Sequence, residues 1–417
     1  MPKIRNIVKG DTAIWVTFFL LCVISILEVF SASSFLTYKG GVFGPIIKHV
    51  GMLAVGAIAI LVVSNISCKY FKLLTPLLLP ISFLMLLLVF VIGDATNEAH
   101  RWLPLGGIQF QPSEIAKGTL ILAVAQILSF MQTEAGADRR AMKFILIISL
   151  PIILPIMAEN LSTAILLGGV IFLMMIIGRV PAQQLLKLSG FVIMLIVVFV
   201  ALVMLIGKTD SESETMAMEH STEFVDDATN VEKKKEHDPL HRVNTWKSRI
   251  LSFFNDDEID PATFDWDKNG QVAHSRIAIA SSNVIGRGFG NSVARDWLPQ
   301  AFADFIYAII IEETGIIGAI IVLALYLFLL FHTGVIARNC ANTFPAFLAM
   351  GLALLLVSQA FFNMCVAVGV APVTGQPLPL ISKGGTSTII NCIYIGVILS
   401  VSHTAKRRDA VVANENK

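Results

Sequence analysis

Long apolar stretches alternate with short polar segments along most of the chain. A helix needs about 20 predominantly apolar residues to cross the hydrocarbon core of a bilayer. The pattern therefore predicts about ten transmembrane helices, at residues 14–33, 45–65, 73–93, 111–132, 143–158, 160–178, 188–206, 303–331, 343–371 and 378–402. The predicted fold is an all-α polytopic membrane protein.

The composition agrees with this prediction. Of the 417 residues, 55% are hydrophobic and 15% are charged, whereas soluble domains have roughly 25% charged residues. The net charge of +1 gives no indication of nucleic-acid binding. Five cysteines are scattered in or beside the apolar stretches, without the spacing of a metal site or a disulfide framework.

Basic residues predict the orientation, because short cytoplasmic loops carry an excess of Lys and Arg. With the N-terminus inside, every cytoplasmic segment contains at least one basic residue and the short outer loops contain far fewer. We therefore expect both termini to be cytoplasmic. The first apolar run is long enough to span and is interpreted as a transmembrane helix, not a signal peptide. Glu28, late in this span, is expected to reach outward.

The predicted spans divide the chain into four parts. These are an N-terminal membrane half with seven helices (1–206), a large extracytoplasmic loop between helices 7 and 8 (207–302), a C-terminal membrane half with three helices (303–403) and a cytoplasmic tail (404–417). Within the loop, residues 208–241 are polar and charge-mixed, which predicts a mobile segment. The remainder is aromatic enough to pack against the membrane domain. Its glycine cluster at 286–290 predicts a tight turn near a ligand or a helix end.

Polar residues gather at the predicted outer ends of the helices, where charge near hydrocarbon is costly and indicates function. Asp304 begins the span that follows the large loop. Glu114 and Lys117 are three residues apart and share a helix face, so they form either a self-sufficient ion pair or part of a site with Arg101. Gln111 is expected at the N-cap of the same helix, ahead of Pro112.

Two polar breaks lie in the same predicted region. Glu159 and Asn160 separate two apolar runs, either as a turn with a helix cap or as part of a site. The second break, residues 372–387, contains prolines, glycines, Ser382 and Lys383. Irregular backbone at membrane depth is tolerated only inside protein or beside a wet cavity. Gln359 and Asn363 are interpreted as interhelical hydrogen-bonding residues.

These residues are expected to surround one outward-facing cavity. Arg101, Lys117 and Lys383 suit a diphosphate, which Arg can bind through two parallel hydrogen bonds. A carboxylate such as Asp304 suits general-base catalysis on a hydroxyl. The residues alone therefore predict an outer-face site for an anionic lipid head group.

The motifs also resemble a known family. Arg-Trp-Leu-Pro-Leu-Gly-Gly at 101–107, together with residues 110–117, 286–292, 298–307, 374–382 and 384–385, is similar to the SEDS proteins (FtsW, RodA and SpoVE). The similarity extends over about residues 14–403. The Leu-Pro-Leu-Gly-Gly sequence makes the chain more similar to FtsW than to RodA.

This resemblance implies a peptidoglycan glycosyltransferase that polymerises lipid II at the outer face of the bacterial inner membrane, at the division septum. The implied partners are an FtsI-like class B penicillin-binding protein and other divisome membrane proteins. The implied catalytic residue is Asp304. Predicted substrate-binding residues are Arg101, Gln111, Glu114, Lys117, Glu159, Asn160, Ser382 and Lys383. Asn160 replaces an Asp of the family pattern, and Glu159 is a possible substitute for that acid.

Other interpretations stay open at this point. Ten spans and broken helices also suit a lipid II flippase or transporter. A RodA-like elongation polymerase and a division scaffold with a degenerate cavity are further alternatives. The sequence contains no dedicated cluster of metal ligands, but a divalent cation (Mg²⁺ or Mn²⁺) could help to neutralise the diphosphate.

Overall fold

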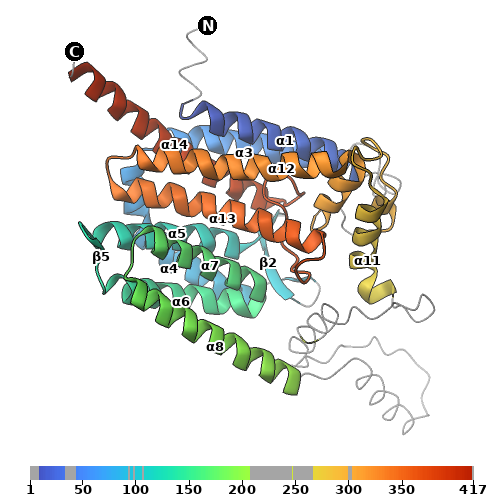
Figure 1. Ribbon diagram of the computed structural model, residues 1–417, viewed down its shortest axis with the longest axis horizontal. Helices are drawn as coiled ribbons and strands as arrows, with labels where there is room; N and C mark the ends of the chain where they lie inside the picture. Colours follow the sequence, from blue (N-terminus) through green and yellow to red (C-terminus); the bar gives the residue numbers. More distant parts are fainter. Residues whose placement is uncertain are drawn as a thin grey trace. The chain divides into compact units, whose positions relative to one another are not determined.

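The computed structural model of the protein describes residues 9–32, 44–92, 94–96, 99–105, 108–206, 247, 266–298 and 303–415. Within this part of the chain, nine helices are long and apolar enough to cross a membrane, and Leu161–Ile177 is a shorter apolar helix. The ten helices are α1 (Thr12–Ala32), α3 (Gly44–Ser64), α4 (Cys68–Ile92), α5 (Pro112–Phe130), α6 (Ala141–Glu159), α7 (Leu161–Ile177), α8 (Ala182–Ile206), α12 (Ile306–Arg338), α13 (Thr343–Ala367) and α14 (Thr386–Glu415) (Figure 1).

Each predicted span corresponds to one helix, so the predicted number and order of helices are confirmed. The largest differences in bounds concern α14, which begins at Thr386 and not at 378, and ends at Glu415 and not at 402. Pro377 and Pro379 have no backbone N–H to donate to a helix, and Leu380 adopts a positive φ of 68°. The polar break therefore continues to the start of α14.

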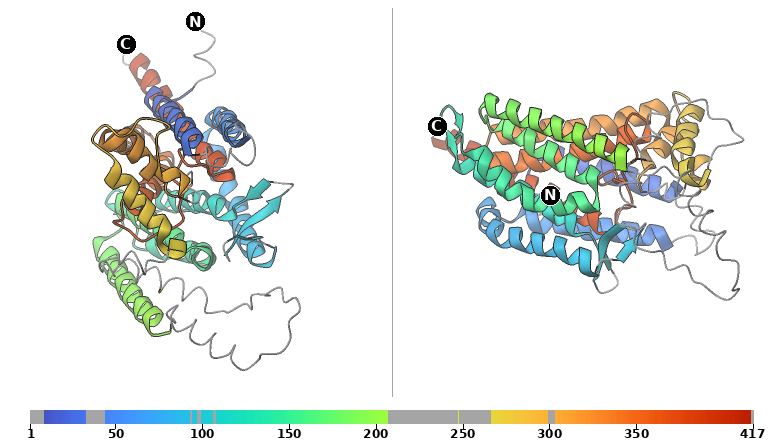
Figure 2. Two further views of the ribbon diagram at one scale, coloured as in Figure 1. Left: turned by 90° about the vertical axis from the view of Figure 1, so that its right-hand side faces the viewer. Right: turned by 90° about the horizontal axis from the view of Figure 1, so that it is seen from below.

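The sequence pattern did not predict the elements within the loops. Three short strands, β1 (Asp94–Thr96), β2 (Ala99–Leu105) and β3 (Ile108–Phe110), form an antiparallel sheet in the order β1-β2-β3. Figure 2 shows this sheet beside α4. A two-stranded hairpin, β4 (Gln132–Thr133) and β5 (Gly136–Ala137), follows α5, and the large loop contains α11 (Trp266–Ser281) and the 3₁₀ turn η2 (Ala294–Asp296). Except for β2, these strands have only two or three residues, too few to produce a visible alternation.

Two compact units make up the chain, and the site residues named below, including those of the polar break from Thr374 onward, lie in the larger one. Residues 186–267 with 371–373 form the smaller unit, of which α8 is the main described element. The predicted mobile segment 208–241 lies outside the described residues.

Helix α13 is at the centre of the larger unit, where it packs against α5, α7, α12 and α14. Figure 1 shows α13 running between α12 and α5. A Cβ atom at Gly351 would collide with Ile121 of α5 and Met174 of α7, so glycine permits this close packing. At the other edge, a Cβ at Gly10 would meet Leu399 of α14. The residues just before α1 therefore lie beside the middle of α14.

The glycine cluster of the large loop docks into a kink in α12. Gly315 interrupts this helix with φ 70° and ψ −168°. The kink leaves the carbonyls of Glu312 and Glu313 available, and they accept hydrogen bonds from the backbone N–H groups of Arg287 (3.0 Å) and Gly288 (2.8 Å). The predicted tight turn is thus present, and its neighbour is a kinked helix.

Substituting Gly315 by Ala should lower the stability of the protein. A non-glycine residue at this φ and ψ is strained by about 1–3 kcal/mol, and its Cβ would also collide with the carbonyl of Val284. Thermal unfolding in detergent would measure the loss. The control is Gly334→Ala in the same helix, where nothing lies within 4 Å of the added atom. Equal melting temperatures for the two variants would contradict the prediction.

Candidate functional site

Asp304 lies in the turn immediately before α12 and is partly exposed. Its backbone carbonyl accepts a hydrogen bond from Nδ2 of Asn363 on α13 (2.8 Å). The carbonyl of the preceding residue, Ala303, accepts a hydrogen bond from Oγ of Ser382 (2.6 Å). The turn that carries the predicted catalytic acid is therefore tied both to α13 and to the polar break.

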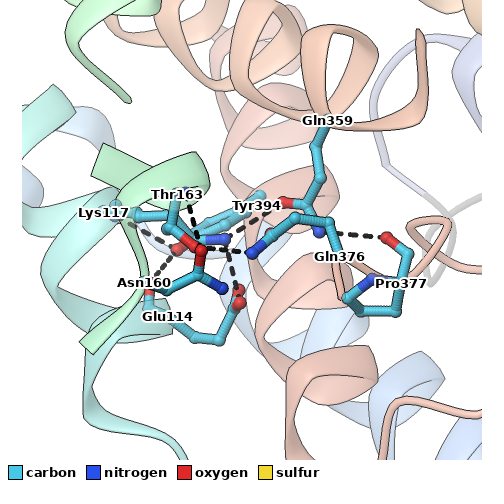
Figure 3. A network of polar contacts seen from close by, with 9 residues as sticks. Glu114, Lys117, Asn160, Thr163, Gln359, Gln376, Pro377 and Tyr394 are labelled. Carbon is cyan, nitrogen blue, oxygen red and sulfur yellow. Dashed lines mark hydrogen bonds and ion pairs between the residues drawn. The ribbon is translucent and has the colours of Figure 1, made fainter. Parts of the chain in front are cut away.

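Glu114 and Lys117 form the predicted ion pair, with 2.9 Å between Nζ of Lys117 and Oε1 of Glu114. The pair is not self-sufficient, because Nζ also donates to Oε1 of Gln359 on α13 (3.0 Å). Gln359 in turn donates through Nε2 to the carbonyl of Pro377 (3.2 Å). Figure 3 shows this chain of contacts, which links α5 to the polar break through α13.

Burial makes the interactions of this pair energetically important. Glu114 is 3% exposed and Lys117 is 0% exposed. Oε2 of Glu114 has no hydrogen-bond partner among the described residues. The backbone around the pair is held by Tyr394 of α14, whose hydroxyl donates to the carbonyl of Glu114 and accepts from the N–H of Gly118 (3.1 Å).

Most side chains of the polar break between Thr374 and Ser382 are buried in protein, which is one of the two environments predicted for it. Side chains of neighbouring helices form hydrogen bonds with this segment. Gln376 donates through Nε2 to Oγ1 of Thr163 on α7 (2.5 Å), and its carbonyl accepts from Nδ2 of Asn363 (2.7 Å). Within the break, Oγ of Ser382 accepts from the N–H of Leu378 (2.8 Å). Ser382 thus acts as both donor and acceptor between the break and the Asp304 turn.

Asn160 is the N-cap of α7, as the turn-with-cap interpretation expected. Its Oδ1 accepts hydrogen bonds from the N–H groups of Ser162 (3.1 Å) and Thr163 (3.2 Å). Because Gln376 donates to the side chain of Thr163, the cap lies beside the polar break (Figure 3). Glu159 ends α6 and is buried, at 2% exposed.

The remaining predicted residues lie around this centre. Lys383 follows Ser382 in the break and is partly exposed. Burial, and then the positive charge of Lys48, lower the pKa of Lys383 below its usual range. Gln111 occupies the N-cap position of α5 ahead of Pro112, as predicted, although its side chain makes no capping hydrogen bond. Arg101 lies on β2, and its side chain is outside the described residues.

Four further residues organise the site. Gln359 and Asn363 make the interhelical hydrogen bonds predicted for them, but the sequence did not show that their partners are Lys117 and the Asp304 turn. Gln376 and Tyr394 were missed. A tyrosine inside an apolar helix was the available signal for Tyr394, since a buried hydroxyl requires a hydrogen-bond partner.

A second group of buried acids, Glu312 and Glu313, belongs to α12 itself. Glu312 accepts hydrogen bonds from Oγ of Ser292 (2.5 Å) and from the N–H of Val293 (3.0 Å), and it lies 3.5 Å from the guanidinium of Arg287. Glu313 accepts a hydrogen bond from Ser31 of α1. Glu312 therefore fastens the large loop to α12.

The prediction that Glu28 reaches outward is wrong, because Glu28 is 0% exposed. Neither of its carboxyl oxygens has a hydrogen-bond partner among the described residues. The helix face that carries Glu28 turns toward the bundle and not toward the interface, a property that the hydrophobicity of the span did not reveal.

Substituting Glu28 by Met should raise the free energy of unfolding. A buried polar group without partners destabilises the folded state by about 1–3 kcal/mol. The change removes this group and keeps a side chain of similar length. Glu312→Met is the matched control. It should lower the free energy of unfolding, because it deprives Ser292 and Val293 of their hydrogen-bond acceptor. Thermal unfolding of both variants in detergent checks the prediction, and a loss of stability in Glu28→Met would show that Glu28 has a stabilising partner.

Within the part of the chain that the structure describes, no three His, Cys, Asp or Glu side chains form a group that could hold a metal ion. The acids of the site are instead separated into the Glu114 pair and the Asp304 turn.

The comparison with known families decides the assignment. The family model of the cell cycle proteins FtsW, RodA and SpoVE matches residues 11–233 and 237–407. The chain belongs to this family, the SEDS proteins. It is thus a multi-pass membrane protein in a family of peptidoglycan glycosyltransferases.

Individual relatives of this SEDS protein agree in length as well as in sequence. The probable peptidoglycan glycosyltransferase FtsW of Coxiella burnetii is 29% identical over 392 residues, which cover 92% of this chain and 93% of that protein. The peptidoglycan glycosyltransferase MrdB of Escherichia coli (strain K12) is 28% identical over 392 residues, 93% of each. These identities do not separate the FtsW role from the RodA (MrdB) role.

Solved structures confirm the fold. RodA of Thermus thermophilus matches with a TM-score of 0.61 at 22% sequence identity, covering 95% of this chain and 98% of that one. A chain from a peptidoglycan synthase complex that coordinates polymerization and crosslinking matches with a TM-score of 0.67, at the same identity and coverage.

Proposed function

We propose that this SEDS protein polymerises lipid II into glycan strands at the outer face of the bacterial inner membrane. The observation that carries the proposal is the position of Asp304. Its turn is fixed to α13 by Asn363 and to the polar break by Ser382, while the residue itself stays partly exposed. An acid held in this way can act on an incoming hydroxyl group.

In the proposed reaction, Asp304 removes the proton of the 4-hydroxyl of the acceptor's terminal sugar. That oxygen attacks the anomeric carbon of the donor with inversion, and the bond to the polyprenyl diphosphate breaks. The proton remains on Asp304, and the diphosphate leaves with the electron pair. Electrostatic stabilisation of the leaving group by fixed cations is a major term in such reactions.

Two lysines of the site have different access to that diphosphate. Lys383 follows Ser382, whose hydroxyl donates to the residue before Asp304, so a partly exposed cation lies beside the acid's turn. Lys117 has no exposed surface. A bound diphosphate would favour charged Lys383 and oppose the effect of burial on its pKa. Arg101 would add a third cation.

The proposal includes a role in cell division, at the septum, with an FtsI-like class B penicillin-binding protein and other divisome membrane proteins. It rests on the FtsW-like sequence at 101–107. A RodA-like role in elongation is the alternative. A fluorescent fusion expressed in growing cells distinguishes them, since septal bands support division and lateral patches support elongation. Mg²⁺ or Mn²⁺ bound to the diphosphate is proposed to assist the lysines.

Polymerisation of lipid II by the purified full-length protein tests the enzyme itself. The cognate penicillin-binding protein and Mg²⁺ or Mn²⁺ are added, and glycan strands are separated on a gel. Strands that require the wild-type chain support the proposal. If no strands form while lipid II crosses the bilayer of proteoliposomes, the protein is a transporter.

A further inference from the structure

We propose that Gln359 and Asn363 are positioning residues that fix Lys117 and Asp304 relative to each other. The inference rests on the proposed function, because it concerns the geometry of the same reaction. Neither amide is assigned a catalytic part, since both act through the groups that they hold.

The two amides share one face of the most central helix. They are four residues apart on α13, which separates them by about 6 Å along the axis and places them on the same side. Each is 1% exposed. Helix α13 packs against α5, which carries Lys117, and against α12, which Asp304 precedes. It is therefore the element best placed to hold the cation and the acid at a fixed separation.

Gln359 makes two contacts that require an acceptor and a donor on the same side chain. Lys117 has only hydrogen-bond donors, and the carbonyl of Pro377 only accepts. The Oε1 atom of Gln359 accepts from Lys117, and its Nε2 atom donates to Pro377. Glutamate could keep the first contact but not the second, and Met could keep neither.

Asn363 uses its amide nitrogen twice. One hydrogen bond goes to the carbonyl of Asp304 (2.8 Å) and the other to the carbonyl of Gln376 (2.7 Å). An ionised Asp at this position would only accept hydrogen bonds, and Leu would neither donate nor accept, so neither residue could bind the two carbonyls. Asn363 thus joins the acid's turn to the polar break.

The two amides also meet at the break, because their acceptors there are the consecutive residues Gln376 and Pro377. Lys117, the Asp304 turn and the polar break are consequently all hydrogen-bonded to one face of α13, and this helix fixes the distances between them. Displacing a reacting group by about 1 Å can cost on the order of 100-fold in rate, even when the substrate still binds. Loss of either amide should therefore lower kcat and leave the KM for lipid II nearly unchanged.

The test compares Gln359→Met, Gln359→Glu and Asn363→Leu with wild type in the lipid II polymerisation assay, with kcat and KM measured separately. Matched controls are Gln184→Met and Asn65→Leu. They remove amide-to-carbonyl hydrogen bonds of 3.0 Å and 2.7 Å outside the site. Hydrogen exchange of the backbone amides of residues 303–310 is followed in every variant as a readout that does not depend on activity.

We expect kcat to fall about 100-fold in Gln359→Met and Asn363→Leu, with KM within threefold of wild type. Gln359→Glu, which keeps the contact with Lys117, should fall less and remains informative if Gln359→Met does not fold. Exchange at 303–310 should rise in Asn363→Leu and stay unchanged in both controls.

Two results would overturn the inference. One is an unchanged kcat in the α13 variants, and the other is a raised KM at constant kcat, which would make the amides part of substrate binding. Failure of the proposed function looks different, because wild type itself would then make no strands. In that case unchanged exchange at 303–310 in Asn363→Leu would still show that Asn363 does not hold the Asp304 turn.

Discussion

Replacing Asp304 by Asn should reduce lipid II polymerisation by about 10²–10⁴-fold, the contribution typical of a positioned general base. The substitution is nearly isosteric. The turn is held through backbone carbonyls by Asn363 and Ser382, and these contacts do not involve the Asp304 carboxylate. The variant should therefore fold, insert into the membrane and bind lipid II, and lose the reaction alone.

The measurement is the initial rate of strand formation beside the melting temperature of the same preparation. Asp138→Asn is the control, because Asp138 is an exposed acid in the loop after β5, away from the site. A rate near that of wild type for Asp304→Asn would remove Asp304 from the mechanism. The remaining acids, Glu114 and Glu159, are 3% and 2% exposed and could act only after a movement that uncovers them.

The helices were predictable because each needs about 20 apolar residues, and a run of that length is visible in the sequence. The chemistry-bearing residues were also visible, since a charge beside hydrocarbon is unusual whatever surrounds it. The end of α13 and the start of α14 were less visible. Apolar residues such as Leu378 and Leu380 continue through a segment that proline and a positive φ keep out of the helix.

The connections of the site could not be predicted in the same way. Whether Gln359 meets Lys117 depends on α13 packing against α5, and helix pairing leaves no local trace in an apolar sequence. Glu28 is different, because the polar residues Thr17, Ser25 and Ser31 are buried on the same face of its helix. That face was therefore marked in the sequence, although the prediction for Glu28 did not use the signal. Residue types therefore identified the components of the site, and only the packing showed that α13 joins them.

Replacing Lys117 by Met should destabilise the protein by about 3–5 kcal/mol, the cost of leaving one partner of a buried ion pair uncompensated. Glu114 would keep a carboxylate that is 3% exposed, with one oxygen already lacking a hydrogen-bond partner among the described residues. Gln359 would lose the donor to its Oε1 atom. Thermal unfolding in detergent would measure the loss, and the polymerisation rate is expected to fall below detection.

The double variant Glu114→Gln with Lys117→Met separates the structural part of this effect from the chemical part. It removes both charges, so most of the lost stability should return, because neutral side chains often replace a buried ion pair at little cost. If the positive charge of Lys117 assists departure of the diphosphate, the double variant stays inactive although it is stable. Recovery of polymerisation together with stability would instead show that the pair only holds α5 in place, and the charge beside the leaving group would then have to come from Lys383.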